Sequence, residues 1–132
     1  MTKSQRRNLP HKSDVYISEE NVVIRHRQAN FKMKKHGHDF DLPYYTNKSG
    51  WKKTSRTPGN LQIFKNKIVE TTLNGKKIEG TYRNDHKVVH YFDSKTRRNV
   101  LYDVDTKEFI SGWKLTPEQI QDLIKNKNVG KF

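Results

Sequence analysis

The hydrophobic period of the chain changes from about 3.6 to 2 near Lys77, and this change limits the folds that the second half can adopt. Apolar side chains there recur at every second position in four short runs, as in strands that bury one face of a sheet. The links between the runs are short and rich in turn-forming residues, so neighbouring strands should be antiparallel. The sequence therefore predicts a four-stranded antiparallel β-meander from residues 78–82, 88–92, 100–104 and 109–115.

A helix that ends at Gly37 is predicted ahead of this sheet. Ser18, followed by Glu19 and Glu20, resembles a capped helix start. A short strand at residues 22–24 is the alternative for the beginning of this segment. The helical interpretation rests on side chains that recur three or four residues apart, as on one helical face: Val22, His26, Ala29, Met33, His36 and Phe40.

Two further helices are predicted from their start and stop signals. One begins at Thr57-Pro58 and ends at Asn74-Gly75, and Thr116 with Gln119 forms the capping-box pattern of a short third helix. The predicted fold class is therefore α+β. Two N-terminal helices should pack on the four-stranded antiparallel β-meander, and a short C-terminal helix should follow it.

The length of 132 residues fits one domain. Residues 1–14 are basic with almost nothing apolar, so we expect a flexible basic arm followed by a single domain over residues 15–132. Hydrophobic residues make up only 31% of the chain, but the aromatic content of 11% and the alternating runs indicate a folded protein. No apolar run approaches the ~20 residues that span a bilayer, and the N-terminal residues do not resemble a secretory signal. We therefore expect no membrane span and action in the cytoplasm.

The chain carries 27 basic and 14 acidic residues, which gives a net charge of +13 and a pI of about 10.0. Such a charge attracts polyanions, of which nucleic acid is the first candidate, an anionic membrane the second and an acidic protein the third. The chain has no cysteine, which excludes a disulfide framework, a thiolate metal site and a cysteine nucleophile.

Imidazole, ammonium and carboxylate groups are concentrated in the nine residues from Lys32 to Phe40. A histidine with an ordinary pKa of about 6.5 can take and give a proton near neutral pH, and lysines can stabilise charge on phosphate oxygens. The cluster thus favours a nuclease, and a solvated basic helix end is the alternative. Asp39 can either orient the His36 ring or cap the residues that follow.

The pattern His36-Gly37-His38-Asp39 also contains potential metal ligands. A zinc or magnesium nuclease usually has further histidine or carboxylate clusters, and only His86 and His90 extend the pattern here. We therefore expect no metal and no other cofactor.

Several short segments occur in a characteristic order. The upstream part is Lys35-His36 followed by Asp39-Phe40. The later segments are Gly80-Thr81-Tyr82-Arg83, Tyr91-Phe92, Asn99-Val100 and Phe109-Ile110-Ser111-Gly112-Trp113-Lys114. Together, over roughly residues 32 to 115, these segments resemble the C-terminal catalytic domain of the colicin D family, whose members are bacterial toxin domains that cut transfer RNA in the anticodon loop.

The resemblance implies a metal-independent endoribonuclease. The ribose 2′-hydroxyl would attack the adjacent phosphorus and leave a 2′,3′-cyclic phosphate and a 5′-hydroxyl. It assigns His36 as the general acid/base, Lys35 as a phosphate ligand, and Ser111 and Trp113 as contributors from the last strand. For Trp113 the alternative is core packing beside Phe109 and Leu115 on the same strand face. For Ser111, on that face too, the alternative to a hydrogen bond with phosphate is a hydroxyl that only satisfies groups of the sheet.

This chain departs from the family pattern at one position. The resemblance implies a second functional lysine three residues before the histidine, where this chain has Met33. Lys32 or Lys34 would substitute for it. Lys114 is a less certain ligand, since it lies on the opposite strand face from Trp113. The predicted substrate-binding residues are Lys32, Lys34, Lys114, Arg83 and Trp51.

A toxin of this type implies a neutralising partner. Because the chain is strongly basic, we expect an acidic immunity protein or antitoxin that covers the His36 cleft and mimics the charge of RNA. The enzyme itself would be a monomer acting on transfer RNA in the bacterial cytoplasm, free-standing or delivered as the C-terminal domain of a secreted toxin. The alternative function is a noncatalytic basic adaptor that binds RNA or DNA.

Overall fold

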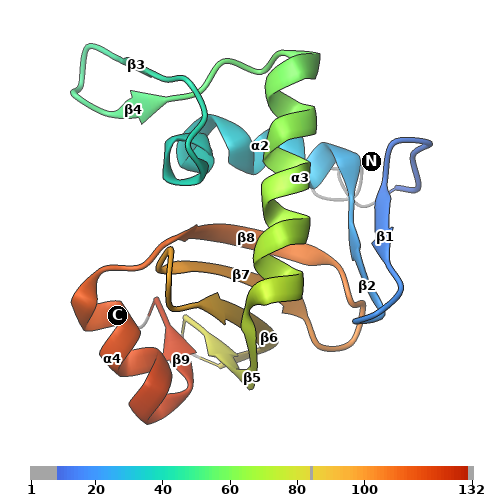
Figure 1. Cartoon of the computed structure of the whole chain (residues 1–132), viewed down its shortest axis with the longest axis vertical. Coiled ribbons are helices and arrows are strands. Elements are labelled where there is room, and N and C mark those ends of the chain that lie inside the picture. Colours follow the sequence, from blue (N-terminus) through green and yellow to red (C-terminus); the bar gives the residue numbers. More distant parts are fainter. Residues whose placement is uncertain (1–8, 84, 131–132) are drawn as a thin grey trace.

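A curled sheet forms the centre of the molecule, with helices on both of its sides (Figure 1). The structure is a computed structural model, and it describes residues 9–83 and 85–130. Within these residues the sheet has the strand order β8-β7-β6-β5-β9. Its strands are β5 (Lys76–Tyr82), β6 (His86–Asp93), β7 (Arg98–Asp103), β8 (Phe109–Lys114) and β9 (Asn128–Val129).

The prediction of a four-stranded antiparallel meander is wrong for the sheet as a whole. Strands β5 to β8 do pair antiparallel in chain order, but β9 adds a fifth strand that runs parallel to β5. β9 has only two residues, too few for any periodic signal. The close approach depends on Gly80, because a Cβ on this residue would collide with the carbonyl oxygen of Lys127.

Two small hairpins were also not predicted. Strands β1 (Val15–Ile17) and β2 (Val22–Ile24) form one, and β3 (Tyr45–Thr46) and β4 (Lys52–Lys53) form the other. The first helix accordingly begins at residue 26 rather than near residue 19. Three consecutive β-branched residues, all buried, make residues 22–24 a strand, which was the alternative interpretation of that segment.

Three α-helices are present among the described residues: α2 (His26–His36), α3 (Pro58–Asn74) and α4 (Pro117–Asn126). Both predicted caps are confirmed, since Thr57 accepts a hydrogen bond from the Asn60 amide and Thr116 with Gln119 forms a capping box. The predicted end of α2 before Gly37 is also confirmed, and a 3-10 turn, η1 (Gly37–Phe40), continues the chain. No helix of residues 9–83 and 85–130 is long and apolar enough to cross a membrane.

The main core lies between one sheet face and the helices α2 and α3, and the smaller cores lie on the other face, next to α4 (Figure 1). A register shift in β8 separates the two sets. Phe109 pairs with Tyr102 and belongs to the main core, whereas Ser111 pairs with Leu101, the neighbouring residue on β7. Phe109 therefore does not share a face with Ser111 and Trp113, and that prediction is wrong.

Asp14 caps α2 from outside the helix. Its carboxylate accepts hydrogen bonds from the His26 amide at 2.7 Å and from Arg25 at 2.9 Å, and Arg25 also pairs with Glu108. His11 stacks on His26 with ring centroids 4.2 Å apart. Residues 11–14 of the predicted basic arm thus contact the helices, and residues 1–8 of that arm lie outside the described residues.

Asp14→Asn should lower the free energy of unfolding by about 1–3 kcal/mol at neutral pH. Burial opposes ionisation of Asp14, but hydrogen bonds from His26, His11 and Arg25 outweigh it and hold its pKa below 3.8. The stabilisation by this carboxylate is therefore full above pH 3.8 and is lost as the pH falls through the lower folded-state pKa.

Urea unfolding from pH 7 down to pH 3 measures this effect, with Asp105→Asn as an exposed control. The two variants should differ at pH 7, and their difference should shrink toward pH 3. A pH-independent difference would show that the role of Asp14 does not depend on its charge.

Candidate active site

His36 and Trp113 stack on each other. Their ring centroids are 5.6 Å apart with an interplanar angle of 25°. His36 is the last residue of α2 and Trp113 lies near the end of β8, so the contact joins the first third of the chain to its last third. Both side chains are half-buried. The structure therefore brings together two of the residues that the sequence predicted to be catalytic.

The turn after α2 fixes the position of His36. Arg98 on β7 donates to the carbonyl oxygen of Asp39 at 2.8 Å and to the Asp41 carboxylate at 2.8 Å. The Arg98 guanidinium also lies over the Phe40 ring, which is fully buried against α3. These contacts attach η1 to the sheet and hold the end of α2 above β8.

Burial lowers the pKa of His36 to about 3, and the positive charges of Lys32, Lys35, His38 and Lys53 contribute to the shift. The imidazole is therefore neutral at neutral pH. None of the described residues forms a hydrogen bond with it; Asp39 pairs with His38 instead, at 3.4 Å. The ring has a nitrogen free to accept a proton, but a pKa this far below neutral makes it a weak base until a negative charge lies beside it.

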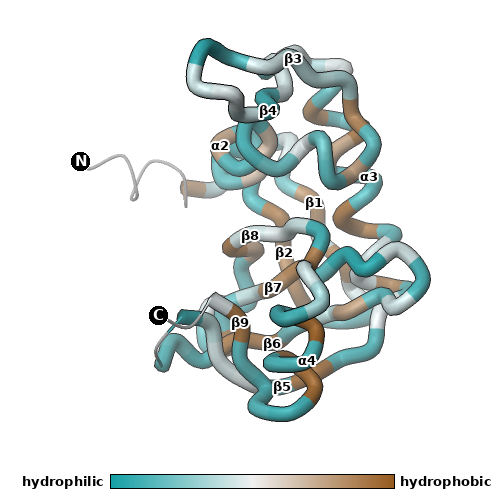
Figure 2. Tube along the Cα trace, turned by 90° about the vertical axis from the view of Figure 1, so that its left-hand side faces the viewer, coloured by the Kyte–Doolittle hydropathy of each residue, from teal (hydrophilic) through white to brown (hydrophobic). Residues whose placement is uncertain are grey.

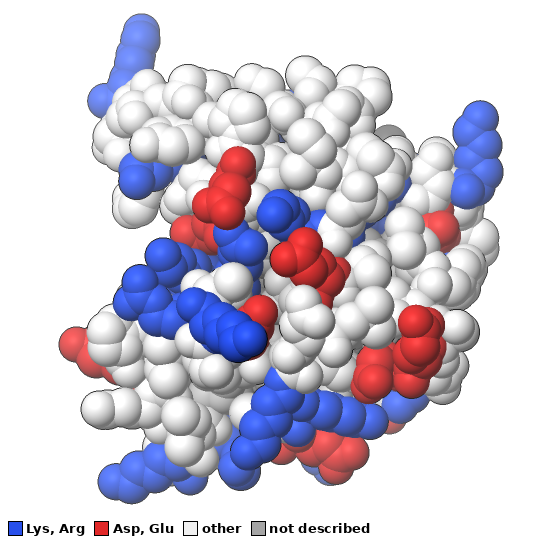
Figure 3. Space-filling view, in the orientation of Figure 1, with Lys and Arg blue, Asp and Glu red and all other residues white. Residues whose placement is uncertain are grey.

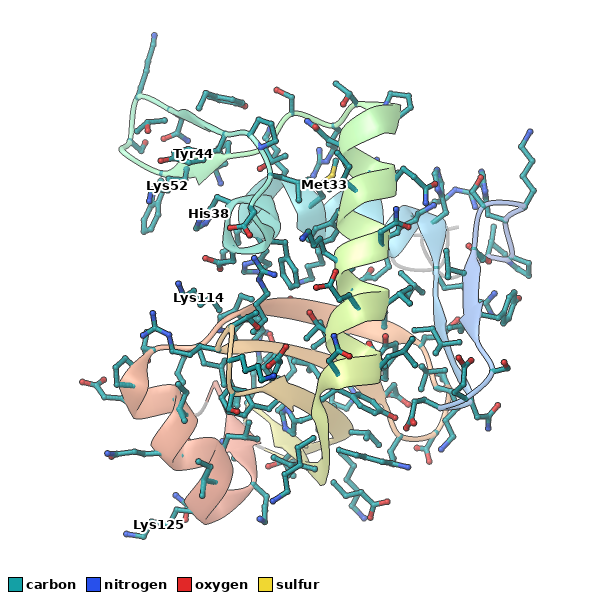
Figure 4. All side chains as sticks on the ribbon, in the orientation of Figure 1. Met33, His38, Tyr44, Lys52, Lys114 and Lys125 are labelled. Atoms are coloured by element: carbon teal, nitrogen blue, oxygen red, sulfur yellow. The ribbon has the colours of Figure 1, made fainter. Side chains whose placement is uncertain are left out.

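Lysines surround His36, but the position three residues before it, where a lysine was expected, holds Met33. Met33 is fully buried in the main core and is labelled beneath α3 in Figure 4. Lys32, Lys35 and Lys53 act on His36 electrostatically. Lys53 was not predicted, because only the β3–β4 hairpin returns it to α2. Lys34 and Lys35 are exposed on the last turn of α2.

Trp113 lies between His36 and Tyr82. The Tyr82 ring, from β5, is 6.0 Å from that of Trp113, which shows how far the sheet curls to bring β5 and β8 together. The indole N–H donates to Gln119 Oε1 at 3.2 Å, and the same oxygen accepts the Thr116 amide of the capping box. Trp113 therefore both packs on the smaller cores and presents its ring beside His36.

Ser111 lies below Trp113 on the same face of β8 and is buried. Its hydroxyl has no hydrogen-bond partner among the described residues, and the same holds for the Asn99 side-chain oxygen. The Asn99 amide donates to His90 Nδ1 at 3.0 Å, and His90 Nε2 donates to the Thr81 carbonyl at 2.9 Å. Buried polar side chains thus lie on the same sheet face as Trp113, and of these the sequence had singled out Ser111 as a site residue.

A hollow of about 390 Å³ lies next to this site and contains two of the predicted substrate-binding residues, Lys32 and Arg83. Arg83 stacks over Tyr82 at 5.1 Å, and His86 pairs with Asp103 at 2.7 Å. Tyr82 and Lys32 belong to the hollow and also adjoin Trp113 and His36 respectively. These shared neighbours place the hollow beside the His36–Trp113 pair, although neither His36 nor Trp113 lines it, and the hollow and the pair together are called the cleft below.

Three predicted binding residues, Lys34, Trp51 and Lys114, lie outside this cleft. Trp51 is on the β3–β4 hairpin and is 66% exposed. Lys114 is exposed on the opposite face of β8 from Trp113, on the side of Arg98 (Figure 4). Within residues 9–83 and 85–130, no three His, Asp or Glu side chains are grouped closely enough to hold a metal ion.

Positive charge dominates the surface around the site. The ion pairs of the described residues involve Arg25, Arg98 and two histidines. Figure 3 shows several Lys and Arg side chains on the left-hand side, from the β3–β4 hairpin down to the sheet, with fewer Asp and Glu side chains among them. This distribution suits a polyanionic ligand. The described lysines that have no carboxylate partner there include Lys34, Lys35, Lys52 and Lys53.

The fold that carries this site is similar to one found in a solved complex. The similar chain has 26% sequence identity and a TM-score of 0.55, and the match covers 76% of the present chain and 99% of the other. That chain is a ribonuclease. It comes from Escherichia coli and was solved in complex with its inhibitor protein. No protein-family model and no curated protein sequence matches the present chain.

Replacing Lys35 by glutamine should raise the pKa of His36 toward, but not above, its ordinary value of 6.5. Loss of one ammonium group relieves the repulsion of the imidazolium, whereas burial still opposes ionisation. The His36 Cε1–H resonance, followed by NMR from pH 3 to pH 8, measures this change. Lys125→Gln on α4 is the control and should leave the titration unchanged. A wild-type midpoint between pH 6 and 7 would contradict the description of the site.

Arg98→Met should lower the free energy of unfolding by about 2 kcal/mol, because it removes two charge-assisted hydrogen bonds to the turn after His36. Arg97→Met is the matched control, since the Arg97 side chain is exposed. Urea unfolding compares the two. Equal stabilities would show that Arg98 does not anchor the turn.

Proposed function

We propose that this protein is a toxin-type endoribonuclease that cleaves RNA through attack by the ribose 2′-hydroxyl, without a metal ion. The observation that carries the proposal is the neutral His36, stacked on Trp113 and surrounded by lysines at one end of a cleft. The similarity to the Escherichia coli ribonuclease supports it independently.

In the proposed first step, the neutral His36 accepts the proton of the 2′-hydroxyl. The 2′ oxygen then forms a bond to phosphorus, and the bond from phosphorus to the 5′ oxygen breaks. Lys35, with Lys32 and Lys53, stabilises the negative charge that develops on the nonbridging oxygens. The His36 imidazolium is a strong acid in this environment and returns its proton to the leaving 5′ oxygen. The products are a 2′,3′-cyclic phosphate and a 5′-hydroxyl.

The low pKa of His36 suits this cycle when the substrate is bound. In the free enzyme, burial and four neighbouring positive groups disfavour the imidazolium. A phosphodiester in the cleft places a negative charge beside the ring and offsets those groups, so the proton becomes easier to hold during the reaction. The same lysines thereby keep the base neutral before binding and neutralise the phosphate afterwards.

Trp113, which is half-buried and backed by Tyr82, offers a ring on which a nucleobase can stack next to the reacting ribose. Arg83 and Lys32, in the adjoining hollow, are placed for the following phosphate. The burial of Ser111 favours a positioning role beneath Trp113 over direct contact with the phosphate. Lys34 and Lys114, both exposed, would contact the RNA backbone outside the cleft.

Transfer RNA, cut in its anticodon loop, is the substrate that we propose. The support is the resemblance of the segments from Lys35 to Lys114 to the colicin D family, in which the matching histidine, serine and tryptophan positions belong to the site. A structured RNA with an exposed loop also suits a basic surface that leads to an aromatic cleft. We place this activity in the bacterial cytoplasm, reached from a free-standing toxin or as the C-terminal domain of a secreted one.

An inhibitor protein is the partner that we propose. The similar ribonuclease was solved with its inhibitor, and a net charge of +13 favours an acidic protein that covers the His36 cleft in place of RNA. The enzyme is proposed to act as a monomer.

His36→Ala should reduce the cleavage of bulk transfer RNA by about 10²–10⁴-fold, the usual contribution of a positioned proton-transfer group. His38→Ala is the control, because this neighbouring histidine pairs with Asp39 and does not stack on Trp113. Cleavage by the wild type should persist in a chelator, and sequencing of fragment ends should find cyclic phosphates at one position in the anticodon loop. RNA that is bound but left intact by the wild type would favour the noncatalytic adaptor.

A further inference from the structure

The β3–β4 hairpin projects beyond the end of α2 (Figure 1). It exposes three aromatic rings. This segment, residues 43–54, is called the aromatic hairpin below. Tyr44, Tyr45 and Trp51 are 53%, 47% and 66% exposed. The hairpin is teal to white in Figure 2, without the brown of strongly hydrophobic residues, so it does not resemble a detached part of the core.

The three rings are not needed to shape the hairpin. Asn47 accepts hydrogen bonds from the amides of Ser49 and Trp51 through its side chain, and its own amide donates to the Trp51 carbonyl. Gly50 has a φ of 84°, which glycine adopts without strain. Backbone and Asn47 contacts thus close the turn, and the aromatic side chains remain available for a ligand.

The charge of the hairpin is entirely positive. Residues 42–57 contain Lys48, Lys52, Lys53 and Arg56 and no acidic residue. The Lys52 ammonium lies 5.1 Å from the centre of the Tyr44 ring, so a cation and an aromatic face are presented together. Figure 4 shows Tyr44 and Lys52 on the same side of the molecule as His38. Single-stranded nucleic acid is recognised by this combination of stacking surface and positive charge.

The base of the hairpin is attached to the His36 site. The Thr54 amide donates to the Lys34 carbonyl at 2.9 Å, and the Thr54 side chain lies so close to Gly37 that a Cβ there would be 2.5 Å from its hydroxyl oxygen. Lys53 acts electrostatically on His36, and the Tyr44 and His38 rings are 6.1 Å apart. An RNA strand that leaves the cleft beside His36 therefore meets the hairpin next.

We propose that the aromatic hairpin is a second RNA-binding element, which holds unpaired nucleotides that flank the cleaved bond. Bases stack on Tyr44, Tyr45 and Trp51, while Lys48 and Lys52 contact the phosphates between them. This inference rests on the proposed ribonuclease function, and it assigns to the hairpin the preference for a single-stranded loop over a duplex. The cleft supplies the chemistry, and the hairpin supplies affinity and orientation.

Binding to a fluorescein-labelled single-stranded 12-mer RNA, measured by anisotropy in the His36→Ala background, tests the inference. Trp51→Ala and Tyr44→Ala should each weaken binding about tenfold, the usual effect of removing one stacking ring. Tyr16→Ala is the matched control, because Tyr16 is 68% exposed on β1 and lies away from this hairpin (Figure 1). Lys52→Ala removes one phosphate contact, so the slope of log affinity against log salt concentration should become shallower by about one. Lys125→Ala should change this slope less.

Circular dichroism and urea unfolding of each variant separate loss of binding from loss of folding. Unchanged RNA affinity in folded Trp51→Ala and Tyr44→Ala variants would overturn the inference. Lost binding to vesicles that contain phosphatidylglycerol, with RNA affinity unchanged, would instead assign the hairpin to a membrane surface and also overturn it.

The same preparations distinguish this failure from failure of the proposed function. A wild-type protein that cleaves RNA while the hairpin variants bind it normally contradicts the hairpin alone. A wild-type protein that binds RNA through the hairpin but never cleaves it contradicts the ribonuclease and leaves the binding element in place.

Discussion

Arg98 attaches the turn after α2 to the sheet, and the geometry of the site depends on that attachment. The guanidinium donates to the Asp39 backbone and the Asp41 carboxylate while it covers Phe40, whose ring fills the core against α3. The helix end is thereby held over β8 within reach of Trp113. A basic helix end without this anchor would be a solvated surface, whereas here its last histidine is half-buried against an indole.

Burial and neighbouring positive charge both lower the pKa of His36. In many sites a carboxylate orients a histidine and raises its pKa, but here the nearby Asp39 pairs with His38. The imidazole instead stays neutral among ammonium groups and contacts an aromatic ring. In the proposed mechanism, the phosphate of the substrate would supply the negative charge that the protein does not place beside His36.

The sequence predicted the elements with long periodic patterns and missed those without them. α3, α4 and the pairing of β5 to β8 follow from period, caps and turn residues. The strand at Val22–Ile24 was ambiguous because three apolar residues fit either a strand or a helix. β9 and the aromatic hairpin depend on backbone contacts made through tertiary structure, at Gly80 and at Thr54, which no local pattern records. Tertiary contacts that no local pattern records also place Lys53 near His36 and bury Asn99 on the face of Ser111. The motifs around Lys35-His36 and from Ser111 to Trp113, in contrast, contain His36 and Trp113, which do meet.

The contact between His36 and Trp113 also sets an order of assembly during synthesis. The ribosome makes α2 early, but Arg98, which holds its end, and Trp113, which stacks on its histidine, are made more than 60 residues later. In a nascent chain the His36–Trp113 pair therefore does not form until β8 has left the exit tunnel. Under the proposed function, this delay would keep the growing chain from cutting transfer RNA at the ribosome that makes it.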